Sequence, residues 1–295
     1  MKNYFIILSL IIFINSCKED GPFIDFSPTR VKLQGDTEYV AAVLAVPQKR
    51  NVLLEDITGV KCPNCPAAHD VAKAINDANP GRIVITALHT FSNDFFTNPN
   101  PPSQGWPDFR PQDSSADYIV TKLLDNPTNL PQGVINRKKF PAEAYRYFSY
   151  SKWAGYINQE LVLPDSINLE ISNSYNPTSR ELTVVIKMEC TDSIPHDVYL
   201  SVGITESKII GKQLSGTAYI TNYEHNHIFR KMLTTLSGLK INSSTVVLDA
   251  RKVVVRVFKY SLPAGWNESN CSVIGILHNN ASVIDVIQCA EKKIL

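Results

Sequence analysis

The chain has 295 residues, a formal net charge of +1 at pH 7 and 19% charged residues. This length exceeds that of one typical domain, so we expect about two domains, each able to bury a hydrophobic core. No block of Lys and Arg stands out, so the composition argues against a nucleic-acid partner and against membrane binding by charge alone.

The N-terminus has the pattern of an export signal. Lys2 provides a short basic head, and an apolar run to Ile14 follows. A helix needs roughly 20 residues to span a bilayer of about 30 Å, so this run predicts a signal peptide over residues 1–16. The letters INSC, which end at Cys17, resemble a bacterial lipobox, where cleavage leaves an acylated cysteine. We expect Cys17 to be lipidated; the alternative is an ordinary signal peptide.

A tether and then an α/β domain are expected next. Residues 17–47 begin without periodicity and end in a predicted strand at Glu38–Val46. Residues 48–162 alternate strands and helices, which predicts an α/β domain. Its expected elements are a strand at 51–57, a helix at 63–78, a strand at 82–90, a long loop at 92–112, a helix at 113–126, a tight hairpin at 133–140 and a helical region ending near residue 161.

Beyond Pro164 the pattern changes to strands alone. Turn signals such as Asn176-Pro177 separate several of them, which predicts an all-β immunoglobulin-like sandwich over residues 163–295. The interval 208–250 has no clear assignment. The expected strands lie at 166–172, 181–190, 198–207, 252–262, 271–279 and 282–290.

Cys62 and Cys65 stand between the first strand of the α/β domain and its first helix. A thiolate is the species that attacks a disulfide, and a helix N-terminus stabilises its charge. We therefore predict that Cys62 lies before the helix with an exposed sulfur and attacks a substrate disulfide. Cys65, one turn in and buried, would resolve the mixed disulfide. This leading hypothesis is thiol–disulfide exchange with disulfide-bearing envelope proteins, and it requires no cofactor.

Leu130-Pro131 precedes a hydrophobic strand, at the place where thioredoxin-like folds carry a cis-proline. In those folds this proline lies against the dithiol and shapes the substrate groove. Most X–Pro bonds are trans, so the cis assignment of Pro131 rests on this resemblance. One difference is that Val60-Lys61 replaces the Trp that usually precedes the first cysteine in thioredoxins.

Two other interpretations of the motif stay open. In the first, Cys62, Cys65 and His69, with His89 from the end of the neighbouring strand, bind Cu(I) or Zn(II). Structural zinc takes four ligands, however, and the chain has no second CxxC. In the second, Cys62 and Cys65 form a permanent disulfide in a non-catalytic surface binding or adhesion protein.

The remaining cysteines raise the question of a second disulfide. A three-residue hairpin loop at 279–281 would place Cys271 opposite Cys289 and allow a bond, whereas a two-residue loop would turn the side chains to opposite faces. Cys190 is expected to be a buried apolar residue. The sequence HNH at 225–227 is expected to be a structural turn or strand edge.

Four segments carry a resemblance to a family. They are LLEDITGVKCPNCP from Leu53, LPQGVINRK from Leu130, HNHIFRK from His225 and LPAGWNESNCSVIGILHN from Leu262. In this order behind a lipobox, they resemble the twenty-eight-kilodalton outer membrane protein family of bacterial lipoproteins. The resemblance implies a lipid-anchored outer membrane protein, periplasmic or surface-exposed, with a thioredoxin-like domain and a C-terminal β-sandwich. It maps the dithiol to Cys62 and Cys65 and the cis-proline to Pro131, and it implies no particular reaction.

Overall fold

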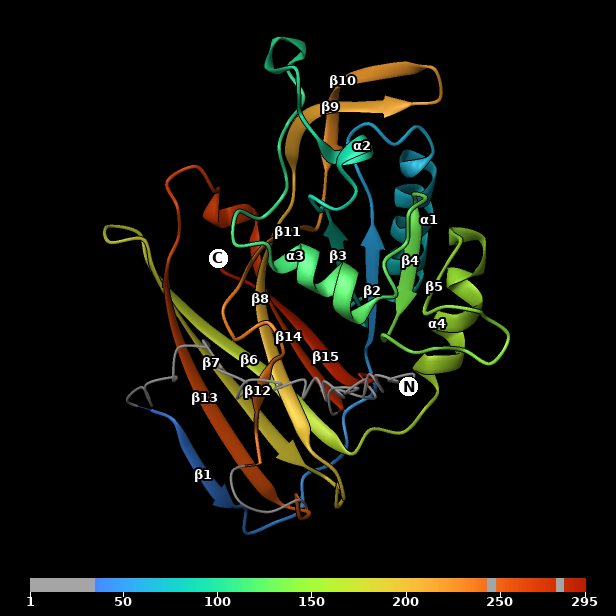
Figure 1. Cartoon of the computed structure of the whole chain (residues 1–295). Helices are drawn as coiled ribbons and strands as arrows, with labels where there is room; N and C mark the ends of the chain where they lie inside the picture. The colour runs from blue at the N-terminus through green and yellow to red at the C-terminus, as the bar shows by residue number, and fades with distance from the viewer. Residues whose placement is uncertain (1–34, 243–247, 280–283) are drawn as a thin grey trace, which may run out of the picture. The chain divides into compact units, whose positions relative to one another are not determined.

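Strands dominate the structure, a computed structural model that describes residues 35–242, 248–279 and 284–295 (Figure 1). The strands are β1 (Thr37–Val40), β2 (Val52–Ile57), β3 (Ile83–Leu88), β4 (Gln132–Ile135), β5 (Tyr147–Phe148), β6 (Ile167–Asn176), β7 (Glu181–Cys190), β8 (Val198–Glu206), β9 (Ile209–Ser215), β10 (Ala218–His225), β11 (Ile228–Met232), β12 (Leu239–Lys240), β13 (Lys252–Ser261), β14 (Cys271–Asn279) and β15 (Val286–Lys293). The α-helices are α1 (Cys65–Ala78), α2 (Asp94–Thr97), α3 (Ser115–Tyr118), which continues as a π-helix (Ile119–Leu123), and α4 (Trp153–Leu161).

Two sheets share the core of the C-terminal half. A nine-stranded sheet has the order β15-β14-β8-β11-β3-β2-β4-β5, with β12 beside β8, and a four-stranded sheet has the order β1-β13-β7-β6. Apolar side chains of β6, β7 and β13 pack against those of β8 and β14 in one cluster. In β7 buried residues alternate with half-buried ones, as expected for a strand with one face on the core. The architecture is therefore β-rich and sandwich-like, and all six strands expected beyond Pro164 are present.

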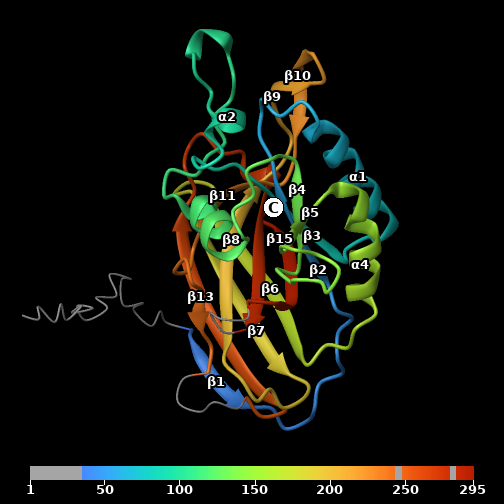
Figure 2. The same cartoon turned by 45° about the vertical axis from the view of Figure 1, so that its right-hand side comes forward.

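The N-terminal half is built around β2, all six residues of which are buried. β2 and β3 are parallel, and α1 makes the crossover that parallel strands require. β4 pairs with β2 in antiparallel register, and β5 pairs with β4. Figure 2 shows α1 and α4 on one side of these strands and α3 on the other. Both faces of β2 are consequently covered, which explains why its residues other than Glu55 and Asp56 are apolar.

The spacing of apolar residues explains α1. Its buried residues are Cys65, Ala68, Ala72 and Ile75, three or four positions apart, so they form one stripe that packs on the sheet. The helix ends before Asn79-Pro80, since proline cannot continue it. The sequence prediction of a helix at 63–78 is confirmed.

The nine-stranded sheet crosses the boundary expected between residues 162 and 163. Ile228 of β11 pairs with Ala87 of β3, and the Ala87 N–H donates to the His227 carbonyl (2.7 Å). The described residues accordingly belong to one compact unit. β11 lies in the interval that local periodicity does not assign, and a pairing between positions so far apart leaves no local signal.

The expected tight hairpin at 133–140 is only half present. The chain turns at Asn136 and Arg137, which both have positive φ, but the returning strand is β5, further along the chain. Gly133 of β4 pairs with Phe148 there. The expected strand at Glu38–Val46 is likewise shorter, since only β1 is formed.

The Cys271–Cys289 disulfide prediction is wrong. Both cysteines are free and buried, and Ile276 is the residue opposite Cys289. Cys271 is thus displaced by five positions, or about 17 Å along the strand. Neither loop length considered for this hairpin produces the observed register. Cys190 is free and buried, as expected.

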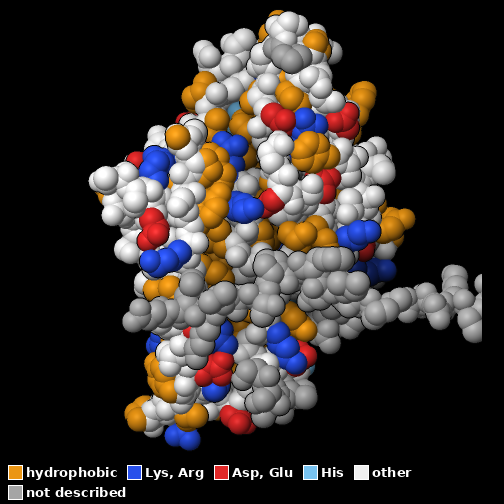
Figure 3. Space-filling model, turned by 60° about the vertical axis from the view of Figure 1, so that its left-hand side comes forward, with side chains coloured by type: hydrophobic (Ala, Val, Ile, Leu, Met, Phe, Trp, Pro, Cys, Tyr) orange, Lys and Arg blue, Asp and Glu red, His pale blue; other side chains and the backbone are white. Residues whose placement is uncertain are grey.

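The surface carries mixed charges. The face in Figure 3 shows Lys and Arg side chains interspersed with Asp and Glu, and a band of hydrophobic side chains between them. Within the described residues no helix is long and apolar enough to cross a membrane. Cys17 and the predicted signal peptide lie outside the described residues.

Candidate functional site

Cys62 and Cys65 are joined by a disulfide, with 5.4 Å between their Cα atoms. Cys65 is the first residue of α1, and Cys62 lies in the turn before it, as the motif predicts. Both residues are 0% exposed to solvent. The prediction that the Cys62 sulfur is exposed is therefore wrong, and two parts of the chain cover it.

The first cover is the hairpin of β9 and β10, which lies with α2 at the C-terminal end of β2 (Figure 1). The Leu214 N–H donates to the carbonyl of Val60 (2.8 Å). Nε2 of Gln213, a residue 0% exposed, donates to the carbonyl oxygens of Gly59 and Cys62 at 3.2 Å each. Local periodicity does not predict this hairpin, so it could not predict the cover.

The second cover is α2. The Lys61 N–H donates to the carbonyl of Phe96 (2.8 Å). Glycine at position 59 permits this approach, because a Cβ there would lie 2.6 Å from the Phe96 oxygen. A larger residue would displace α2 from the cysteine turn.

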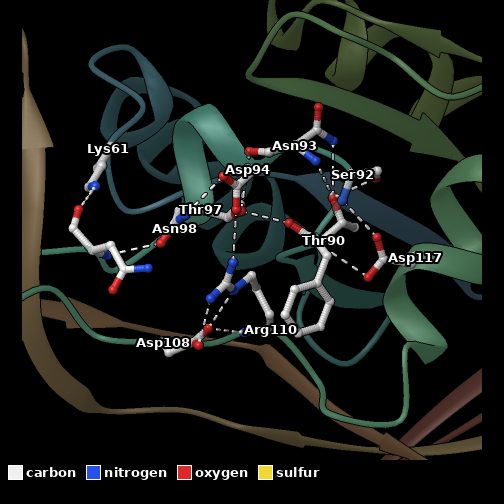
Figure 4. Close-up of polar contacts among 12 residues, drawn as sticks. Lys61, Thr90, Ser92, Asn93, Asp94, Thr97, Asn98, Asp108, Arg110 and Asp117 are labelled. Carbon is white, nitrogen blue, oxygen red and sulfur yellow. Dashed lines mark hydrogen bonds and ion pairs between the residues drawn. The ribbon is translucent and has the colours of Figure 1, made fainter. Parts of the chain in front are cut away.

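Polar contacts hold the loop that carries α2 (Figure 4). The Arg110 guanidinium donates to Asp94 at the start of α2 (3.0 Å). Asp117 of α3 accepts from the backbone N–H groups of Phe91 and Ser92, at 3.0 and 2.8 Å. The long loop expected from the sequence is thus tied to α3 and covers the disulfide.

The Leu130–Pro131 peptide bond is cis, as the resemblance to thioredoxin-like folds predicts. Leu130 packs in the same apolar cluster as Cys62 and Cys65. The role of Pro131 in a substrate groove stays a prediction.

Asp56 lies beside these elements on β2 and is only 2% exposed. Burial raises the pKa of Asp56 to about 8. Its Oδ2 is 3.4 Å from Nε2 of His69, whose pKa is lowered to about 4, by burial first and then by His227. At pH 7 the carboxyl is mostly protonated and the imidazole is neutral, so this contact is not an ion pair. Oδ1 of Asp56 has no hydrogen-bond partner among the described residues.

The His69 ring connects α1 to its surroundings. Nε2 is 3.0 Å from the Thr58 hydroxyl, and Nδ1 is 2.7 Å from the Tyr223 hydroxyl on β10. The Tyr223 contact joins the covering hairpin to the helix that begins at Cys65. His69 is thus a neutral hydrogen-bonding residue at the junction of α1, β2 and β10.

Two further histidines gather beside His69. The pKa of His225 is lowered to about 3, mainly by burial and secondly by the nearby His69. Burial also lowers the pKa of His227. Neither ring nitrogen of His225, nor Nδ1 of His227, has a hydrogen-bond partner in the described part of the chain. His225 does end β10, as the expectation of a strand edge implies, but its side chain lies in a buried polar cluster.

The metal interpretation fails on this arrangement. Cys62 and Cys65 share a disulfide, so neither supplies a free thiolate. The His89 ring packs edge-on against Phe109, and no described residue hydrogen-bonds to its Nδ1. Across the described ranges, no group of three or more His, Cys, Asp or Glu side chains could hold a metal ion.

The sequence contained one signal for this cluster. Glu55 and Asp56 interrupt the otherwise apolar strand β2, and Asp and Glu are almost never fully buried unless they are paired. Together with His69, Tyr223 and His225, Asp56 lines a cavity of about 440 Å³ between α1 and β3. Tyr223 and His225 come from the unassigned interval, so only the structure could bring them here.

Three solved structures are similar to the chain, and the first of them shares its fold. HBP35 of Porphyromonas gingivalis superposes with a TM-score of 0.63 and 17% identity, covering 83% of this chain and 75% of that one. A protein of Agrobacterium tumefaciens has a TM-score of 0.48 at 12% identity, covering 85% and 97%. A domain of the outer membrane lipoprotein Omp28 from P. gingivalis has a TM-score of 0.32 at 14% identity, covering 44% of this chain and 88% of that one.

No curated protein matches the chain. The family described as outer membrane protein Omp28 matches residues 125–294, more than half of the sequence, and the chain therefore belongs to this outer membrane family.

Proposed function

We propose that the protein is a non-catalytic binding lipoprotein of the outer membrane, in which the Cys62–Cys65 disulfide is a permanent crosslink. One observation carries this proposal: both cysteines are 0% exposed beneath the β9–β10 hairpin. Exchange requires a thiolate to reach a sulfur atom, and reactive cysteines are partly exposed. A disulfide enclosed by Gln213 and Leu214 instead fixes the start of α1 to the turn that these two residues contact.

The scaffold of this proposal is a thioredoxin-like unit joined to an immunoglobulin-like sandwich. The order β3-β2-β4-β5, the crossover α1 and the cis bond at Pro131 support the first. The shared core of the two sheets supports the second. Family membership and the lipobox that ends at Cys17 support the lipid anchor. A fold of this kind does not by itself imply redox chemistry.

A redox titration of the full chain tests the proposal. The protein is equilibrated in dithiothreitol buffers, alkylated, and analysed by mass spectrometry at Cys62 and Cys65. We expect a midpoint below about −300 mV, the range of structural disulfides. Alkylation after denaturation is the control that all thiols can react. A midpoint between about −120 and −270 mV, with Cys62 alkylated first in the native protein, would refute the crosslink.

Thiol–disulfide exchange is the second candidate. The position of Cys65 at the N-terminus of α1, with the cis Pro131 nearby, favours it, but the hairpin would have to leave Cys62. The Cys65→Ser variant with oxidised glutathione tests it. Attack by the Cys62 thiolate would form a mixed disulfide and release one glutathione thiolate. If the mixed disulfide forms as fast as it does with free cysteine, the result supports exchange. If the folded protein forms no glutathione adduct, exchange is excluded.

A further inference from the structure

The cavity beside α1 is separate from the disulfide. It has a volume of about 440 Å³, within the range of small-ligand pockets, and lies between α1, β3 and residues 223–228. Strand alternation directs Asp56 to the α1 side of β2, whereas its neighbour Ile57 packs in the cluster that contains the cysteines.

Four buried polar atoms in the cavity wall have no hydrogen-bond partner of normal geometry among the described residues. They are Oδ1 of Asp56, both ring nitrogens of His225 and Nδ1 of His227. Asp56 and His225 are each 2% exposed. Buried polar groups nearly always have a hydrogen-bond partner, so this set indicates a missing one. A neutral imidazole has one donor N–H and one acceptor nitrogen, and the Lys212 backbone lies close to the His225 ring and favours its N–H form. The acceptor nitrogen and, once ionised, the Asp56 carboxylate are then left over, and both require a donor.

The acidic residues that line the cavity favour a donor with a positive charge. The carboxyl groups of the described lining residues belong to Asp56, Asp70, Asp77 and Glu224. The lining has one ammonium, that of Lys73, and Asp77 pairs with it. The uncompensated carboxylates at pH 7 are those of Asp70 and Glu224, and Asp56 joins them as the pH approaches 8. Such a wall attracts a cation. Since no metal cluster is formed by the described side chains, an organic cation fits best.

Apolar side chains complete the wall and define the rest of the ligand. Ala72 of α1, Ile85 of β3 and Ile228 of β11 line the cavity together with the acidic residues. A protonated primary amine has three donors and no acceptor, and an alkyl chain suits the apolar part.

We propose that this cavity binds a primary ammonium group on an unbranched aliphatic chain, with the ammonium donating to Asp56, His225 and His227. A second cationic end of a diamine would lie near Asp70 and Glu224. The inference rests on the proposed binding function and names its ligand class. The same chemistry occurs in free diamines and in the lysine side chain of a partner protein.

Isothermal titration of the full-length protein with cadaverine tests the proposal, with 1,5-pentanediol as the uncharged probe of equal length. We expect cadaverine to bind and the diol not to bind. The Asp56→Asn variant should weaken cadaverine binding at least about ten-fold, the scale of one lost charged contact. Asp165→Asn is the matched control, because Asp165 is also a buried carboxyl with a raised pKa, of about 6, but lies outside this cavity.

A pH series adds a signature that a merely structural Asp56 would not produce. With the pKa of Asp56 at about 8, the ionised fraction rises about ten-fold from pH 7 to pH 9, and cadaverine affinity should rise with it. Asp56→Asn should abolish this rise. If that variant is unstable, the exposed pair Asp70→Asn and Glu224→Gln should still weaken cadaverine relative to a monoamine.

The outcomes separate cleanly. Absence of cadaverine binding, equal binding of the diol, or a pH-independent affinity would overturn the proposal. Tighter binding of Nα-acetyl-lysine amide than of cadaverine would identify a lysine side chain as the source, and the reverse would identify a free diamine. The redox titration is independent, so an active disulfide with an amine site would refute only the crosslink.

Discussion

Two neighbouring carboxyl groups on β2 have opposite environments. Glu55 and Asp56 are 1% and 2% exposed. Glu55 accepts three hydrogen bonds from the Arg137 guanidinium, at 2.8 to 3.2 Å. Asp56 faces α1, and within the described ranges its only close ionisable contact is the neutral His69 ring; its pKa is raised to about 8. The comparison teaches that a buried carboxylate paired with a cation belongs to the architecture, whereas a buried carboxyl without a charged partner indicates a candidate site.

Of the changes considered, breaking the Glu55–Arg137 ion pair should lower the free energy of unfolding most. Arg137→Met leaves the Glu55 carboxylate buried and unpaired, so we expect a loss of about 3–5 kcal/mol in the free energy of unfolding. Urea denaturation measures it. The double variant Glu55→Met, Arg137→Met removes both charges and should recover most of the loss. A single variant as stable as the wild type would show that the pair does not hold β2 to β4.

Replacing Asp56 by the neutral Asn should instead stabilise the protein, and the gain in stability should grow as the pH rises. Asp56 is protonated in the folded protein up to about pH 8 but ionises near pH 3.8 in the unfolded chain. Between these values the folded state binds one more proton, so the free energy of unfolding falls as the pH rises. The full shift corresponds to roughly 6 kcal/mol, and because proteins relax around a buried charge we expect an effect of about 2–4 kcal/mol.

Denaturation of Asp56→Asn and wild type at pH 4, 6 and 8 measures this difference. We expect the two curves to be close at pH 4 and the variant to be more stable at pH 8. Glu55→Gln is the contrasting variant, since it removes a charge that already has a partner and should lower stability. A constant difference between Asp56→Asn and wild type across the pH range would contradict the buried neutral carboxyl.

The Cys62–Cys65 disulfide should affect the free energy of unfolding less than Glu55 or Asp56 does. Closing a loop as short as that between Cys62 and Cys65 removes chain entropy worth about 2 kcal/mol. Replacing both cysteines by alanine should lower the free energy of unfolding by that amount, while cadaverine binding stays within about two-fold. Loss of cadaverine binding in this variant would mean that the two faces of β2 are coupled.

The sequence was sufficient for features set by local pattern and insufficient for those set by distant contacts. The stripe from Cys65 to Ile75 predicts α1, and alternation predicts β7, because each depends on neighbours a few positions away. The exposure of Cys62 was mispredicted because Gln213, 151 positions later, covers it. Glu55 and Asp56 look alike in sequence, and only the location of Arg137 distinguishes them.

The smallest effect should come from the contact that joins the hairpin to α1. Tyr223→Phe removes the hydroxyl that lies 2.7 Å from Nδ1 of His69, which should lower stability by about 1 kcal/mol. Tyr219→Phe, on the same hairpin and 57% exposed, is the control and should change stability by less than about 0.5 kcal/mol. Hydrogen exchange at the Leu214 amide reports whether the cover loosens. Faster exchange in Tyr223→Phe alone would mean that His69 holds the hairpin over the disulfide, and equal exchange in both variants would leave the Gln213 contacts as the main attachment.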